Sequence, residues 1–236
     1  MSAAYAPFIT AQRQLALAGP QLVTQACQFD AANYSDHLFE EHRIELPPGA
    51  ARWVRKRKAE FLAGRIAAQG ALALLGLPAD VPMGADRAPC WPDAVAGSIT
   101  HSDRQAICSV ARREQVAALG IDLETMITAQ VAGEIAASIV SARETALLRK
   151  LPMPFEQALT IAFSAKESLF KALHSDVRAF FDFDAAELCA LDPAAGTFTL
   201  RLTGTLVPRW IVGTLLAGRY LLEPDTVLTH IAMPAY

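Results

Sequence analysis

One apolar helical segment of this chain carries three charges that a simple buried helix does not need. In the stretch AFSAKESLFKALH, residues 162–174, Lys166, Glu167 and Lys171 stand among apolar residues at helical spacing. Glu167 and Lys171 are four residues apart and share one helix face, where such a pair contributes roughly a few tenths of a kcal/mol. At this point the two residues can be interpreted either as a surface ion pair or as a functional acid–base pair.

The interpretation of Ser164 determines where we place the start of this helix. It precedes Glu167 by three residues, which is the spacing of an N-terminal capping box. An apolar stripe runs through Ser164 from well before it, and its members are Phe155, Leu159, Ala162, Phe163, Leu169 and Leu173. We therefore place Ser164 inside a helix at 155–174.

A second set of acids lies in GIDLE, residues 120–124. Residues two apart on a strand face the same way, about 6.5–7 Å apart, so Asp122 and Glu124 project together. Neighbouring carboxylates repel unless a cation lies between them, and hard oxygen ligands suit Mg²⁺ or Mn²⁺ rather than zinc. The alternative is an exposed strand end with solvated acids, because a lone D-x-E is a weak signal.

Two further features suit an anion. The strand-like segment GSITHS, residues 97–102, ends in His101 and Ser102, although a lone histidine is more often structural. The segment RWVRKRKAEFLAGR gathers six basic residues, namely Arg52, Arg55, Lys56, Arg57, Lys58 and Arg65. Clustered positive charges repel one another on a solvated helix face, so they fit better beside an anion with several phosphates.

The elements that would position these residues form two halves of similar pattern. Periodicity predicts, in order, a strand at 21–29, a helix at 52–75, strands at 97–101 and 105–112, a strand through GIDLE, helical stretches at 129–150, a helix at 155–174, and strands at 186–190, 197–203, 209–215 and 218–233. The segment DHLFEEHRIELPP is assigned to a surface loop. Strands in neighbouring runs indicate an α+β fold with mostly antiparallel sheets.

Composition excludes several classes of protein. The 236 residues are 53% apolar and 19% charged, which is enough for a packed core. A net charge of −3 argues against general nucleic-acid binding. The four cysteines are far apart and suggest neither zinc nor disulfides, and the N-terminal stretch MSAAYAPFITAQRQ has no export-signal pattern. We expect a cytoplasmic protein that does not enter membranes.

Together these segments resemble one family. The order R-K-R-K-x-E-F-x-x-G-R, P-C-W-P-D, G-S-I-T-H-S, G-I-D-L-E and F-S-A-K-E-S-x-F-K-A is similar to the Sfp-type 4′-phosphopantetheinyl transferases, on the bacterial branch of enterobactin synthase component D. The resemblance spans about half of the chain, from Arg52 to Lys171. It implies the fold of that family, with two similar lobes, 1–115 and 116–236, related by an approximate twofold, a site in the cleft between them, and a monomer.

The resemblance also implies an activity. Such enzymes transfer 4′-phosphopantetheine from coenzyme A to a serine of an apo acyl or peptidyl carrier protein and release adenosine 3′,5′-bisphosphate. Asp122, Glu124 and Glu167 would hold Mg²⁺, with Mn²⁺ as an alternative, and Lys171 would offset charge on the transferring phosphate. The carrier serine would lose its proton to Glu167, directly or through a metal-bound water. Both routes remain open.

The remaining expected contacts are to coenzyme A and the carrier. His101 and Ser102 would contact phosphates of coenzyme A, and His101 is counted with the catalytic residues. The other expected coenzyme A contacts are Arg57, Arg65, Arg87, Lys166 and Lys171. The segment 126–155 combines apolar residues with Arg143, Arg149 and Lys150 and would suit an acidic carrier. The carrier's pathway, whether fatty acid, polyketide or siderophore synthesis, is not decided.

Two alternatives remain. A different phosphoryl or nucleotidyl enzyme is disfavoured because the chain lacks the G-x-x-x-x-G-K-[ST] and G-x-G-x-x-G patterns. A non-catalytic protein that binds coenzyme A or a carrier would be favoured by a missing metal ligand. All three acids are present, so we favour the enzyme.

Overall fold

The computed structural model describes residues 6–19, 21–78 and 80–235. Residues 1–5, part of the N-terminal stretch in which we found no export signal, lie outside the described residues. The chain divides into two compact units, and the boundary lies between Val116 and Ala117. We call the preceding part unit 1 and the following part unit 2, and describe each by itself.

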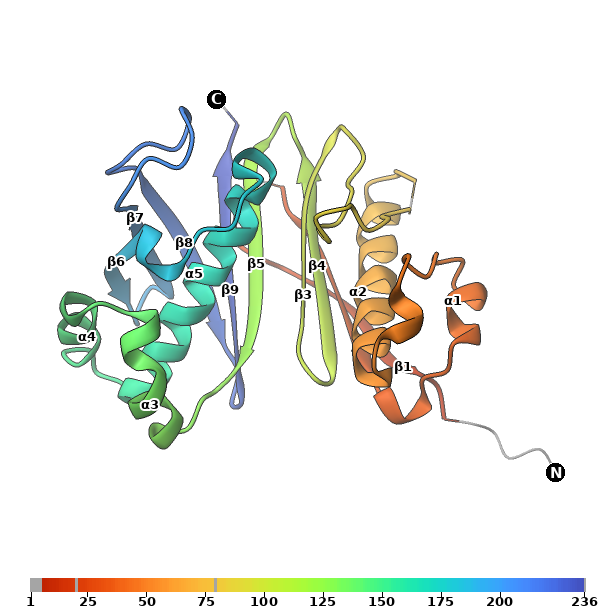
Figure 1. The fold of residues 1–236 in the computed structure, drawn as a ribbon, viewed down its shortest axis with the longest axis horizontal. Coiled ribbons are helices and arrows are strands. Elements are labelled where there is room, and N and C mark those ends of the chain that lie inside the picture. Colours follow the sequence, from red (N-terminus) through yellow and green to blue (C-terminus); the bar gives the residue numbers. More distant parts are fainter. Residues whose placement is uncertain (1–5, 20, 79, 236) are drawn as a thin grey trace. The chain divides into compact units, whose positions relative to one another are not determined.

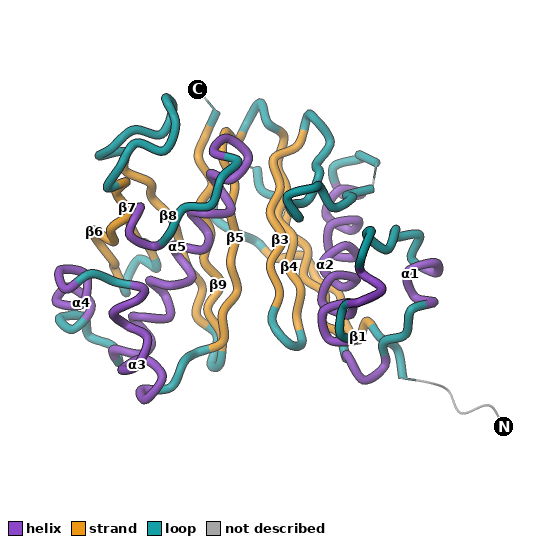
Figure 2. The backbone as a smooth tube through the Cα atoms, viewed as in Figure 1, coloured by secondary structure: helices purple, strands orange, loops and turns teal. Residues whose placement is uncertain are grey.

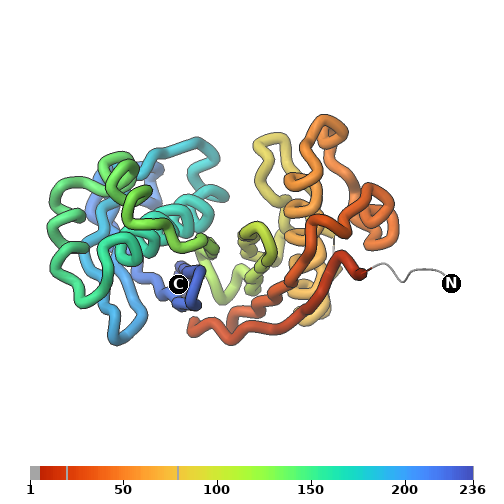
Figure 3. Tube along the Cα trace, turned by 90° about the horizontal axis from the view of Figure 1, so that it is seen from below, coloured from red at the N-terminus to blue at the C-terminus, as the bar shows by residue number. Residues whose placement is uncertain are grey.

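Unit 1 contains a four-stranded sheet among its described residues, in the order β1-β2-β4-β3. Its strands are β1 (Ile9–Leu15), β2 (Val23–Phe29), β3 (Val95–His101) and β4 (Gln105–Arg112). The neighbouring strands pair antiparallel, and β1 and β2 can be followed side by side at the red end of the chain (Figure 3). The predicted strands at 97–101 and 105–112 are therefore confirmed. The strand predicted at 21–29 is also present, but it begins two residues later than predicted.

Helix α2 (Arg55–Leu74) packs on this sheet through β2, β3 and β4 (Figure 1). Four alanines at successive intervals of four residues, Ala59, Ala63, Ala67 and Ala71, are fully buried. Residues four apart lie on one helix face, and their small side chains allow the helix backbone to approach the sheet closely. The predicted helix at 52–75 is confirmed, except that it begins at Arg55, and Arg52 belongs to a preceding 3-10 turn, η2 (Ala50–Arg52).

The segment before α2 is more ordered than we predicted. The assignment of DHLFEEHRIELPP to a surface loop is wrong in part, because α1 (His37–Glu41) lies within it and buries Leu38 and Phe39. A 3-10 turn, η1 (Ala31–Asn33), precedes it. Strand β1 was also missed, because ITAQRQL is an exposed edge strand without the alternation of apolar and polar residues that marks a half-buried one.

Unit 2 is a five-stranded sheet with helices on it, in the order β5-β9-β8-β7-β6. Its strands are β5 (Val116–Thr125), β6 (Ala186–Asp192), β7 (Thr197–Leu202), β8 (Leu215–Leu222) and β9 (Thr226–Pro234). Its helices are α3 (Ala129–Ile139), α4 (Ala142–Leu148), α5 (Phe155–Val177) and the 3-10 turn η3 (Phe183–Ala185). Helix α5 packs on β9 and β7, and α3 lies beside α5 (Figure 2).

The predicted strands at 209–215 and 218–233 are wrong in their limits. Residues 209–214 form a loop, in which Gly213 has φ of +85° and Trp210 is buried with its Nε1 donating to Asp176 at 2.8 Å. The apolar residues there anchor the loop and do not form a strand. The span 218–233 is two strands joined at Glu223, Pro224 and Asp225, because proline cannot donate to a central ladder.

The α+β class with two mostly antiparallel sheets is thus confirmed.

Candidate functional site

Helix α5 can lie close to strand β5 because residue 120 is a glycine. A Cβ on Gly120 would lie 1.9 Å from the carbonyl oxygen of Ser168, a distance that no side chain can occupy. The glycine of GIDLE therefore lets the helix with Glu167 approach the strand with Asp122 and Glu124. We call these three acids the acidic cluster.

Asp122 is fixed by contacts to α5. Its side chain is almost fully buried, with Lys171 Nζ at 2.7 Å from Oδ1. Ser164 Oγ donates to Oδ2 at 2.9 Å, because an ionised carboxylate oxygen can only accept. Ser164 is inside the helix, as predicted, and its hydroxyl is a support for the carboxylate.

The acids of the cluster repel one another. Burial first, and then the charge of Asp122, raises the pKa of Glu124 to about 7, with a smaller contribution from Glu167 and an opposing one from Lys171. Burial and Asp122 also raise the pKa of Glu167, against the effect of Lys171. Buried carboxylates in this arrangement favour a cation beside them.

The acidic cluster has the donor chemistry for a hard divalent cation, because all its donors are carboxylate oxygens. Among the described residues, no three His, Cys, Asp or Glu side chains are already grouped closely enough to hold a metal ion. The ammonium of Lys171 instead contacts Asp122. The triad of metal ligands stays a prediction.

The ammonium of Lys166 is already engaged inside the protein and is not free for its expected contact with coenzyme A. Lys166 is 4% exposed, and Nζ donates to the carbonyls of Ile139 at 2.9 Å and Phe183 at 3.0 Å and pairs with Glu144 at 2.8 Å. These contacts engage all three N–H groups of the ammonium. We therefore withdraw its assignment to coenzyme A.

The basic residues of α2 divide into two groups. Arg55 donates to the carbonyls of Ala31, Ala32 and Tyr34 and so holds the turn η1. Lys58 pairs with Asp36, and Lys56 pairs with Asp103. These three cations are engaged within unit 1, and the sequence pattern did not reveal these contacts because the partners are distant along the chain.

Arg57 and His101 are brought together. Arg57 Nη1 lies 3.1 Å from His101 Nε2, and since arginine only donates, that histidine nitrogen accepts. Glu60 faces both at 3.9 Å. Burial raises the pKa of Glu60, while Lys56 and Arg57 lower it.

Arg65 is a buried cation. Its side chain lies over the Phe61 ring at 4.4 Å, and its Nε has no hydrogen-bond partner among the described residues. Burial lowers the pKa of Arg65 to about 10, so it remains charged at neutral pH. We call Arg57, Arg65 and His101 the basic cluster.

The two other predicted contacts lie in turns. Arg87 is exposed and adopts a left-handed φ of +67° in the turn closed by Gly84 and Ala88. Ser102 begins the β3–β4 turn, where its N–H donates to the Gln105 carbonyl at 2.8 Å. No structural observation assigns either of them a ligand.

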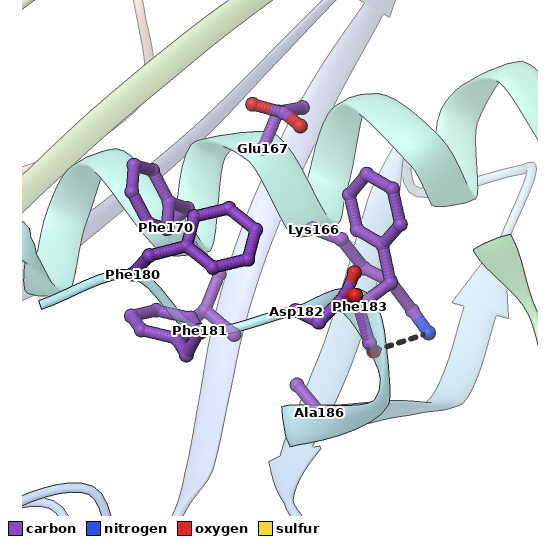
Figure 4. A pocket seen from close by; sticks show the side chains of 9 residues that line it. Lys166, Glu167, Phe170, Phe180, Phe181, Asp182, Phe183 and Ala186 are labelled. Carbon is purple, nitrogen blue, oxygen red and sulfur yellow. Dashed lines mark hydrogen bonds between the residues drawn. The ribbon is translucent and has the colours of Figure 1, made fainter. Parts of the chain in front are cut away.

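A pocket beside Glu167 was not predicted. It has a volume of about 120 Å³ and is lined by Lys166, Glu167, Leu169, Phe170, Phe180, Phe181, Asp182, Phe183 and Ala186. Phe170, Phe180 and Phe181 gather on one side, and the Glu167 side chain extends from α5 away from the Lys166 ammonium (Figure 4). Three phenylalanines within 180–183 directly after the predicted helix were the signal that we overlooked.

Known proteins match both units. Residues 40–111 match the family model of the 4′-phosphopantetheinyl transferase N-terminal domain, and residues 118–223 match that of the 4′-phosphopantetheinyl transferase superfamily. The chain is 38% identical to enterobactin synthase component D of Salmonella typhi, covering 78% of this chain and 75% of that protein. It is 40% identical to the 4′-phosphopantetheinyl transferase Svp of Streptomyces mobaraensis, with 84% and 79% covered.

A more distant relative is the 4′-phosphopantetheinyl transferase PptT of Mycobacterium tuberculosis, at 32% identity with 80% of this chain and 85% of that protein covered. The chain belongs to the 4′-phosphopantetheinyl transferase superfamily. It is a transferase that moves 4′-phosphopantetheine to carrier proteins, so the resemblance seen in the sequence is confirmed.

No helix in the described part of the chain is both long and apolar enough to cross a membrane.

Proposed function

We propose that the acidic cluster holds the divalent cation used in this transfer and that the basic cluster binds phosphates of the donor, coenzyme A. The observation that carries the proposal is the close approach of α5 to β5 at Gly120, which gathers the three acids where burial and the charge of Asp122 raise the pKa of Glu124 and of Glu167. Folding gathers these acids despite their repulsion, which a bound cation would remove. When bound, Mg²⁺ or Mn²⁺ would neutralise charge on the donor's diphosphate.

The residues of α5 then have distinct roles. The serine oxygen of the carrier forms a bond to the phosphorus that bears the pantetheine group, and the bond to the leaving adenosine 3′,5′-bisphosphate breaks. Glu167 takes the serine proton, directly or through a water, because it is a carboxylate on the same helix as Lys171 and beside the proposed cation. Lys171, one helical turn away, carries a positive charge that stabilises the phosphoryl oxygens.

The basic cluster supports donor binding. The buried charge of Arg65 has an Nε without a hydrogen-bond partner among the described residues, and a phosphate would provide one. The Arg57 guanidinium beside His101 offers a second cation for the same ligand. We propose no direct phosphate contact for Lys56 or Lys58, because each is paired with an aspartate.

The pocket beside Glu167 would take the pantetheine arm of the donor. Its phenylalanine walls fit the apolar stretches of that arm, and the carboxylates of Asp182 and Glu167 at its border fit polar groups. A carrier protein of siderophore synthesis is a reasonable first substrate, because one relative is enterobactin synthase component D. We further propose that the enzyme acts as a monomer in the cytoplasm.

The proposal is tested by incubating the protein with coenzyme A and a panel of apo carrier proteins, with Mg²⁺, with Mn²⁺ or with a chelator. Intact-protein mass reports the modified serine. We expect modification with either cation and none with the chelator. Modification at an equal rate in the chelator would overturn the metal role, while a protein that binds coenzyme A without modifying any carrier would support the non-catalytic alternative.

A further inference from the structure

Lys166 and Glu144 form a buried ion pair in unit 2 that donor binding does not explain. Their side chains are 3% and 2% exposed, and Lys166 Nζ lies 2.8 Å from Glu144 Oε1. Glu144 also accepts from the backbone N–H groups of Ser141 and Leu188, each at 2.7 Å. Together with the two carbonyls that Lys166 contacts, every charge of the pair is hydrogen-bonded inside the protein.

Such a pair is a poor way to gain stability. Removing two charges from water costs several kcal/mol, and well-packed apolar residues of the same size are often as stable or more so. A pair with complete hydrogen bonding does, however, fix the groups around it in one arrangement. The question is therefore which groups this pair holds in place.

The contacts of the pair join the end of α3 at Ile139, the start of α4 at Ser141, helix α5, the turn η3 at Phe183 and strand β6 at Leu188. Two of these contacts bear on the site. Lys166 directly precedes Glu167 on α5, and the carbonyl that it holds belongs to Phe183, the last residue of the phenylalanine segment 180–183 (Figure 4).

The segment 178–183 is otherwise held by apolar packing, since Phe170 contacts Phe180 and Phe181, and Phe163 contacts Phe183. It starts at Arg178, which ends α5 in a left-handed conformation with φ of +50°, and Phe180 is 79% exposed. A partly exposed segment with a left-handed residue at one end opens more readily unless the backbone at its other end is also held. The Lys166–Phe183 hydrogen bond fixes the backbone at that other end, where the Phe183 ring also contacts Phe163.

We propose that Lys166 and Glu144 are positioning residues of the transfer reaction, which hold the phenylalanine segment 180–183 as a wall of the pocket beside Glu167. The inference rests on the proposed roles of Glu167 and of the pocket. The charged groups of the two residues are engaged with each other and with the backbone, so neither charge is offered to the donor, although the Lys166 side chain lines the pocket. Their contribution is to the rate, because a displacement of about 1 Å in an active site can cost about a hundredfold in turnover.

The test uses Lys166→Met and the double variant Lys166→Met/Glu144→Gln. The double variant removes both charges, and the glutamine at position 144 retains one side-chain carbonyl oxygen as an acceptor. Measurements are made well below the melting temperature of each. We expect kcat to fall at least about tenfold, with KM for coenzyme A changed less than about threefold. Cleavage by trypsin after Arg178 is a readout that does not depend on the transferase activity. It should accelerate at least about fivefold as the segment opens.

Leu216→Val is the matched control, because Leu216 is fully buried in β8 and contributes no polar contact to the site. It should lower stability while leaving kcat and cleavage after Arg178 near wild type. The proposal is overturned if the Lys166 variants keep the wild-type kcat and the wild-type rate of cleavage. It is also overturned if Leu216→Val changes kcat and cleavage as much as the Lys166 variants do, or if neither Lys166 variant folds, since the pair would then act on stability alone. Glu167→Gln, assayed in parallel, tests the proposed catalytic site separately, because the cleavage readout does not depend on it.

Discussion

The acidic cluster of unit 2 and the basic cluster of unit 1 differ in how the surrounding protein treats their charges. Around the basic cluster, most cations of α2 are already paired, as the exposed Lys56 is with Asp103 and the largely buried Lys58 with Asp36. In the acidic cluster, burial leaves like charges facing one another, and the pKa of Glu124 rises to about 7. The density of charge in the sequence thus overstates how many residues of the basic cluster are available to a ligand. The weak D-x-E signal understates the acidic cluster.

The largest effect should follow a change at Asp122. Asp122→Asn removes a proposed metal ligand and also the partner of Lys171, so we expect carrier modification to fall by about four orders of magnitude. The measurement is the single-turnover rate at saturating Mg²⁺ and coenzyme A. A loss of less than tenfold would place the metal elsewhere and remove the contrast between the clusters.

A smaller and different effect is expected in the basic cluster. Arg65→Met removes a buried charge, so KM for coenzyme A should rise about thirtyfold, the equivalent of a charged hydrogen bond of roughly 2 kcal/mol. Unfolding should show no loss of stability, because that charge has an unpartnered Nε among the described residues. Lys56→Met is the matched control and should leave KM within about twofold. Equal changes in both variants would mean that the cluster acts only through its net charge.

The smallest effect concerns pH and the protein without metal. The pKa of Glu124 is raised from 4.5 to about 7, so its protonated form is favoured by folding. Its contribution to stability is complete below about pH 4.5 and is lost as the pH rises through about 7. Denaturant unfolding with a chelator should show this decline between pH 5 and 8, and Glu124→Gln should flatten it. A slope that is unchanged in Glu124→Gln would assign the decline to other groups.

The sequence predicted those elements whose burial follows a regular period. Helix α5 was predicted from its apolar stripe, and β5 from the run that ends in GIDLE. Strand β1 has no such period because it is an exposed edge, and the loop at 209–214 has a strand-like composition because its Trp210 is an anchor.

Long-range partners explain the failures within the site. The residue types of the acidic cluster were evident, but the role of Lys166 depends on Glu144, which is 22 residues away on another helix. A lysine beside a proposed catalytic glutamate is easily interpreted as a ligand for phosphate until its buried partner is known. The same holds for Arg55, whose acceptors are carbonyls near residue 32.

The central claim is that Glu167 works with Asp122 and Glu124 in the transfer rather than in an ordinary helix-surface pair with Lys171. The most direct test is the rate of carrier modification by Glu167→Gln at saturating Mg²⁺, with coenzyme A binding measured separately by calorimetry. We predict a loss of about a thousandfold or more in rate, with thermal stability unchanged or slightly higher because repulsion with Asp122 is relieved. A rate near that of the wild type would contradict the account.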